Sequence, residues 1–134
     1  MKCLRPLTVD AIVLCEGRIV LIRRKNEPYQ GMLALPGGFV ERDETVEQAV
    51  VREAREETGL DTEIVRLVGV YSDPGRDPRG PIVSVCYLVK ATGGRPGAAS
   101  DAAAVELVRP DEVPALAFDH DRMVGDARLT VEIR

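Results

Sequence analysis

The sequence has no tryptophan, a single histidine and only five aromatic residues among its 134 positions. Its three cysteines are an odd number, at spacings that fit neither a disulfide framework nor a zinc site, so we interpret them as reduced thiols. No apolar run is long enough to span a membrane, because Pro6, Asp10 and Glu16 interrupt the amino-terminal one. We therefore expect a cytoplasmic protein without a membrane partner.

A basic excess is also missing. The formal net charge is -4 and the pI is about 5.1, which argues against nucleic acid as a partner. Fifteen of the eighteen basic residues are arginine, a bias that suits phosphate recognition but that genome base composition explains for the most part. A chain of this length forms one domain, residues 1–134, and can bury roughly two-thirds of its unfolded surface.

One segment in the first half of the chain carries the clearest helix signal. Apolar residues recur there at intervals of three and four: Val46, Ala49 and Val50. Asp43 is the N-cap that we expect before this stripe, and Gly59 suits the position just past the helix end.

The same stripe continues into acidic residues. Steps of three and four lead to Glu53, Ala54 and Glu57, so two carboxylates take positions that face the protein. Glu56 adds a third, and like charges at this spacing cost ~0.2 to 0.5 kcal/mol per pair even on an exposed helix. A divalent cation held by oxygen ligands would remove this conflict. The alternative is a solvated ladder in which Arg52 pairs with Glu56.

These residues, together with the glycines before the helix, resemble the signature of the Nudix hydrolases, G-x5-E-x7-R-E-U-x-E-E-x-G-U, where U is apolar. The matching residues are Gly38, Glu44, Arg52, Glu53, Glu56, Glu57, Gly59 and Leu60. Ala54 is small for its apolar position. The similarity extends over nearly the whole chain, and residues 72–80 and 116–120 are similar to the branch of the family that cleaves ADP-ribose.

The resemblance implies an α/β fold, an α/β/α sandwich with a mixed sheet between helices. The residue pattern predicts strands at 8–15, 18–24, 62–72, 82–91, 104–108 and 129–133. Besides the acidic helix it predicts a helical turn within 111–116 and a helix at 119–127. Loops are expected at 25–38, 73–81 and 92–100, which are rich in proline and glycine.

The function that the resemblance implies is divalent-metal-dependent hydrolysis of a nucleoside diphosphate linked to another group. ADP-ribose, cleaved to AMP and ribose 5-phosphate, is the expected substrate, and Mg²⁺ or Mn²⁺ is the expected cofactor. Two alternatives are a MutT-like hydrolase of oxidised nucleoside triphosphates and a non-catalytic module that binds ADP-ribose. A homodimer is a further expectation from the family.

Four metal ligands follow from the resemblance: the Gly37 carbonyl, Glu53, Glu56 and Glu57. The expected catalytic set is Glu44, Arg52, Glu53 and Glu56. Within it, Arg52 cannot bind a cation and is expected to orient Glu53 or neighbouring carboxylates through a charge-assisted hydrogen bond. Glu44 is expected to brace the loop and the helix start.

The general base is less clearly marked. Ala104 aligns with a position where many relatives carry a carboxylate that activates water or binds a further metal. Asp101 or Glu106 is one alternative, and a helix glutamate, Glu53 or Glu56, is the other.

Candidate substrate contacts combine cations, rings and the glycine loop: Arg23, Tyr29, Gly38, Arg76, Arg79, Phe118 and Asp119. Successive strand residues point to opposite faces, so only one of Arg23 and Arg24 is expected to reach a phosphate. The two rings are candidates for stacking on adenine. His120 could bind a base or ribose, although a lone histidine more often has a structural partner.

Overall fold

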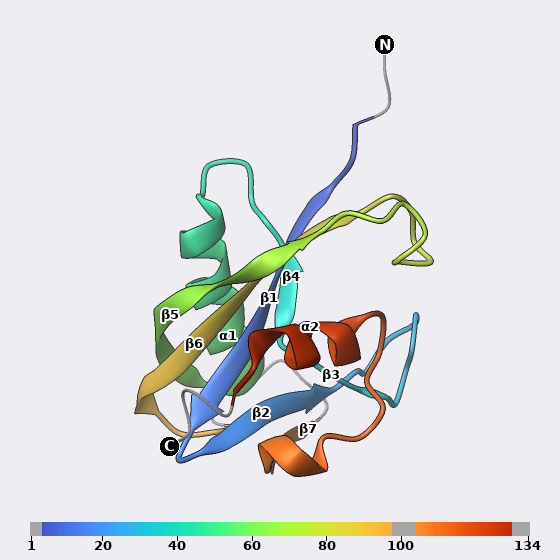
Figure 1. Ribbon diagram of the computed structural model, residues 1–134. Helices are drawn as coiled ribbons and strands as arrows, with labels where there is room; N and C mark the ends of the chain where they lie inside the picture. The colour runs from blue at the N-terminus through green and yellow to red at the C-terminus, as the bar shows by residue number, and fades with distance from the viewer. Residues whose placement is uncertain (1–3, 98–103, 130–134) are drawn as a thin grey trace.

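The computed structural model describes residues 4–97 and 104–129, and a mixed sheet lies in it between two helices (Figure 1). The helices are α1 (Val46–Thr58) and α2 (His120–Ala127), with a short 3₁₀ turn at Pro110–Glu112. The strands are β1 (Leu7–Cys15), β2 (Arg18–Arg23), β3 (Leu33–Ala34), β4 (Gly37–Phe39), β5 (Leu60–Tyr71), β6 (Val83–Gly94) and β7 (Ala104–Val108).

The sheet is built outward from β1. Its strand order is β3-β2-β1-β6-β5. In addition, β4 pairs with β1, and β7 pairs with β2. The β1–β6 pair is parallel and the other pairs are antiparallel. The predicted hairpin between β1 and β2 is confirmed, with positive φ at Glu16 (53°) and Gly17 (74°), as a tight hairpin turn requires.

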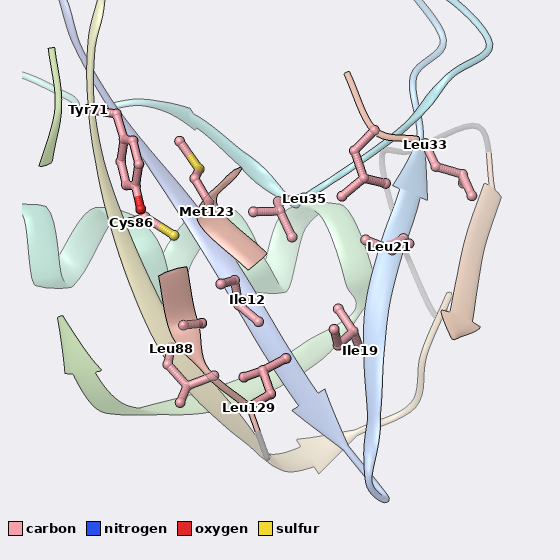
Figure 2. Close-up of a cluster of buried hydrophobic side chains, with 12 residues drawn as sticks. Ile12, Ile19, Leu21, Leu33, Leu35, Tyr71, Cys86, Leu88, Met123 and Leu129 are labelled. Atoms are coloured by element: carbon pink, nitrogen blue, oxygen red, sulfur yellow. The ribbon is translucent and has the colours of Figure 1, made fainter. Parts of the chain in front are cut away.

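Side chains of β1 alternate between two cores, one on each face of the sheet. Val9, Ala11 and Val13 pack on the face that α1 covers, where the helix contributes Ala49, Val50 and Ala54. Ile12 points to the opposite face, where the neighbouring side chains include Leu21, Leu88 and Met123 (Figure 2). The sheet is therefore buried on both sides, as the α/β/α sandwich requires.

The N-cap of α1 is Thr45, so the prediction of Asp43 is wrong. Thr45 Oγ1 accepts a hydrogen bond from the Gln48 backbone N–H (3.1 Å), and Gln48 Oε1 accepts one from the Thr45 N–H (2.9 Å). Asp43 could not form this reciprocal capping box, because the residue three places after it is the apolar Val46. The predicted end at Gly59 is confirmed, with φ of 81°.

Residues 25–38 are not simply a loop, because they contain β3 and part of β4. These strands have two and three residues, too few for an alternating pattern to be recognised. They form because they pair with strands already present: β3 with β2, and β4 with β1.

Three smaller differences concern the second half of the chain. The predicted turn at 111–116 is the 3₁₀ turn that starts at Pro110. Strand β6 extends to Gly94 and so takes up the start of the predicted loop at 92–100, and residues 98–100 of that loop lie outside the described part. Of the predicted strand at 129–133, all residues after Leu129 also lie outside it. Neither helix of the described ranges is long and apolar enough to cross a membrane.

The capping box gives a direct test of the α1 boundary. We expect Thr45→Ala to lower the free energy of unfolding by about 1 kcal/mol, because the Gln48 N–H loses its acceptor. Asp43→Ala is the matched control, since Asp43 is exposed and lies outside the capping box. Denaturant unfolding of both variants measures the difference, and an equal or larger loss in Asp43→Ala would contradict the assignment.

Candidate active site

Arg52 gathers the acidic side chains of α1 and of the segment before it. Its Nε and Nη2 donate to the two oxygens of Glu44 (2.9 and 2.5 Å). Its Nη1 donates to Glu53 (2.6 Å) and Glu56 (3.1 Å), and its Nη2 also donates to the Phe39 carbonyl (3.1 Å). The contact expected with Glu53 and the alternative contact with Glu56 are therefore both present.

Glu44 lies before α1 and links that segment to the helix. Besides the two bonds from Arg52, it accepts one from the Glu41 backbone N–H (2.8 Å). These bonds lower the pKa of Glu44 to about 2, with the Arg52 hydrogen bond as the main cause. The same bond is the main cause that raises the pKa of Arg52, so the pair is fully ionised at neutral pH.

Glu53 is packed against the glycine loop. Only 12% of its side chain is exposed, and a Cβ added to Gly38 would lie 2.6 Å from its carboxyl carbon. No larger residue fits at Gly38 without a shift, which explains the glycine there. Burial is the main cause that raises the pKa of Glu53, the charges of Glu56 and Glu44 raise it further, and Arg52 acts in the opposite direction.

The adjacent Gly37 is equally constrained, because a Cβ there would lie 2.3 Å from the Val9 carbonyl oxygen. Gly37 and Glu57 line the same cleft, beside Gly38 and its neighbour Glu53. The oxygen donors available here, two carboxylates and a backbone carbonyl, are those that Mg²⁺ and Mn²⁺ prefer.

The carboxylates are arranged around Arg52 rather than around a common centre. Among residues 4–97 and 104–129, no three histidine, cysteine or acidic side chains already form a metal-binding group. Glu53 and Glu56 each accept a hydrogen bond from the guanidinium through one oxygen, which leaves the second oxygen of each carboxylate for another partner. The donor set fits a divalent cation in its chemistry.

The cleft beside these residues is lined by both charged and aromatic groups. Arg24, Arg76 and Arg79 are its cations, and Glu57 lies on its acidic side. An adjoining hollow shares Arg24, Glu57, Arg79 and Gly37 with it. A ligand that fills both can therefore meet the helix carboxylates and the arginines together.

Phe118 forms an aromatic wall of the cleft. Its ring centroid lies 4.7 Å from that of Tyr29, in an edge-on arrangement, and 5.2 Å from that of His120. The guanidinium carbons of Arg24 and Arg79 lie 4.9 and 5.4 Å from the same ring. Phe118 thus reaches the cleft directly, whereas Tyr29 packs against it as a second layer.

Asp10 and His120 line the cleft as a buried pair, of which the sequence analysis names His120 but not Asp10. His120 Nε2 lies 3.3 Å from Asp10, and its Nδ1 accepts a hydrogen bond from the Leu35 N–H (3.0 Å). Ser84 also donates to Asp10. Burial raises the pKa of Asp10, but His120 and Ser84 outweigh it, so the pKa is lowered. An acidic residue inside the apolar run of β1 was the available signal.

The two arginines at the end of β2 go to different places. Arg23 donates to Glu106 (2.6 Å) and to the Gly31 carbonyl (2.6 Å), and it borders only the adjoining hollow. Arg24 lines both the cleft and that hollow. Of the pair, Arg24 is therefore the one that enters the cleft, although Arg23 was the candidate.

Strand β7, where a general base is expected by analogy, has no carboxylate that lines the cleft. Ala104 of β7 pairs with Arg23 of β2, and its side chain carries no functional group. Glu106 is the ion-pair partner of Arg23, and Asp101 lies outside the described residues. Of the α1 acids Glu57 lines the cleft, together with Asp10 and Asp77 from other segments.

The loop between β5 and β6 places its arginines beside two aspartates. Arg76 donates to both oxygens of Asp119 (2.9 and 2.7 Å), so this carboxylate is already engaged by the protein. Arg79 forms a similar pair with Asp77.

Comparison with known proteins places the chain in a family. A model of the NUDIX domain matches residues 4–126. An ADP-ribose pyrophosphatase from Methanocaldococcus jannaschii is 48% identical over 120 residues, covering 90% of this chain and 71% of that protein. A MutT-like protein from Streptomyces ambofaciens is 40% identical over 111 residues, covering 82% and 68%.

Solved structures agree with this placement. The NUDIX domain of Shewanella oneidensis NrtR complexed with ADP ribose has a TM-score of 0.85 at 29% identity, with 97% of this chain and 90% of that chain covered. A bifunctional NMN adenylyltransferase/ADP ribose pyrophosphatase from Francisella tularensis, complexed with AMP and a Mn ion, has a TM-score of 0.78 at 28% identity, with 97% and 42% covered. This chain belongs to the Nudix family.

Proposed function

We propose that the protein hydrolyses ADP-ribose to AMP and ribose 5-phosphate with the help of a divalent cation, Mg²⁺ or Mn²⁺. The observation that carries the proposal is the cleft, which brings Glu57 and Gly37 together with Arg24, Arg79 and the Phe118 ring. Glu57 and Gly37 suit a cation, and the two arginines suit a diphosphate. The Phe118 ring suits a flat base or a ribose. The 48% identity to an ADP-ribose pyrophosphatase supports the same substrate.

Hydrolysis of the diphosphate depends on neutralising negative charge and not on a covalent enzyme intermediate. Water attacks one phosphorus, the bond from that phosphorus to the bridging oxygen breaks, and the leaving phosphate carries the negative charge away. A divalent cation, when bound, would supply Lewis acidity for this step. We assign its binding to Glu53, Glu57 and the Gly37 carbonyl, with Glu56 joining them.

The remaining groups have positioning or proton-accepting roles in this proposal. Arg52 keeps Glu53 directed toward the glycine loop, and Glu44 fixes Arg52 in turn. Glu106 is engaged by Arg23, so we assign the general base to a helix carboxylate, Glu53 or Glu56. Arg24 and Arg79 face the diphosphate, and Phe118 offers the surface for stacking.

A substrate panel with the variant Glu57→Gln tests the proposal. We expect wild-type protein with Mg²⁺ or Mn²⁺ to release AMP from ADP-ribose, and Glu57→Gln to lose at least about 100-fold in turnover, because the amide is a weaker metal ligand. Glu63→Gln is the control, since Glu63 is an exposed acid on β5.

The panel also includes 8-oxo-dGTP, in view of the MutT-like relative. Pyrophosphate release from that triphosphate, without AMP release from ADP-ribose, would identify the protein as a hydrolase of oxidised nucleoside triphosphates instead. Tight binding of ADP-ribose with no turnover at saturating metal would indicate a non-catalytic module. Inertness and no binding would contradict all three functions.

The role of Arg52 gives a second prediction. Lysine keeps the charge but cannot reach Glu44, Glu53 and the Phe39 carbonyl at once, so Arg52→Lys should lower kcat by about 10- to 100-fold. Arg55→Lys on the same helix is the matched control, because Arg55 is 73% exposed. Steady-state kinetics with circular dichroism as a fold check measures this. Unchanged kcat in Arg52→Lys would contradict the role.

A further inference from the structure

The loop between β5 and β6 contains two arginines, and their surroundings differ sharply. Arg76 has only 4% of its side chain exposed. Its Nε and Nη2 donate to Asp119, and its Nη1 donates to the Ile82 carbonyl (3.3 Å). Arg76 lines the cleft, but all three nitrogens of its guanidinium already have protein partners. Because Asp119 directly precedes α2, Arg76 ties the loop to that helix.

Arg79 is only partly engaged. Its Nε and Nη2 donate to the two oxygens of Asp77 (3.1 and 2.8 Å), and 37% of its side chain is exposed. Its Nη1 makes no hydrogen bond to the residues that the structure describes. One edge of the guanidinium is thus held by the protein, and the other edge is available to a ligand in the cleft that Arg79 lines.

Asp77 is the residue that fixes this orientation. Its side chain is 2% exposed, and Oδ1 also accepts the Arg79 backbone N–H (2.9 Å). Burial raises the pKa of Asp77, but the Arg79 hydrogen bonds and charge outweigh it and lower the pKa. The aspartate is therefore ionised, and its contact with Arg79 is charge-assisted.

Two aromatic rings complete the setting of Arg79. Its guanidinium carbon lies 5.1 Å from the Phe39 centroid and 5.4 Å from the Phe118 centroid, within range of cation–π attraction. Phe39 follows Gly38 directly, so Arg79 bridges the glycine loop and the aromatic wall. Arg24 lines the same cleft, and two neighbouring guanidiniums favour an anionic ligand between them.

We propose that Asp77 is a positioning residue that presents the open edge of Arg79 to the diphosphate of the substrate, while Arg76 braces the loop without touching the substrate. The inference rests on the proposed function. It assigns substrate binding to Arg79 and a structural role to Arg76, two arginines that the sequence does not distinguish. An arginine on an unsupported loop would lose side-chain freedom on binding. The buried carboxylate restricts that freedom before the substrate arrives.

A double-mutant cycle tests the coupling. We expect Arg79→Gln to raise KM for ADP-ribose by about 10- to 100-fold, the value of a charge-assisted hydrogen bond, with a smaller effect on kcat. Asp77→Ala should raise KM in the same direction, and Asp77→Asn by less, because its amide oxygen still accepts a hydrogen bond. The double variant Asp77→Ala/Arg79→Gln should match Arg79→Gln alone, because Asp77 acts only through Arg79.

Two further variants separate binding from folding. Arg76→Lys should lower the melting temperature with no comparable rise in KM, and Arg109→Gln, an exposed arginine beside Asp111, serves as the surface control. Calorimetric Kd values for ADP-ribose keep the test independent of turnover, so an inactive wild type would overturn the proposed function and not this inference.

Three results would overturn the inference. One is an unchanged or lower KM and Kd in Asp77→Ala, since removing a carboxylate beside an anion site would then have helped binding. Another is additive effects in the double variant. The third is a rise in KM for Arg76→Lys as large as that for Arg79→Gln.

Discussion

The guanidinium of Arg52 is the contact on which the site depends. It joins Glu44, Glu53 and Glu56, carboxylates that would otherwise repel one another near the same helix turn. Removing one partner of such a partly buried group leaves an uncompensated charge, which is far more costly than losing a surface ion pair. The same cluster keeps Glu53 beside Gly38, where the cleft begins.

The fold places arginines in the cleft beside this acidic cluster. Strand β1 pairs with β4 and so fixes the glycine loop against α1, while Arg24, directly after β2, also lines the cleft. The loop after β5 brings Arg79 to the same space, and Arg76 fastens that loop to the start of α2. Carboxylates and guanidiniums from distant segments therefore face one cleft, as a cation-dependent diphosphate hydrolase requires.

The regular elements could be predicted because their signals are local. The hairpin between β1 and β2, helix α1 and the long strands β5 and β6 each have a periodic pattern and a turn or cap residue. Strands β3 and β4 could not, because pairing with β1 and β2 creates them. The buried Asp10–His120 pair and the choice of Arg24 over Arg23 depend on tertiary contacts between residues far apart in the sequence. The capping box of Thr45 and Gln48 is visible in the sequence, whereas Asp43 has no glutamate or glutamine three residues later.

The most direct test of the central claim is a crystal structure with Mn²⁺, measured at the manganese absorption edge. The account predicts an anomalous peak beside Glu53, Glu57 and the Gly37 carbonyl. A structure at saturating Mn²⁺ that has no peak there would contradict it.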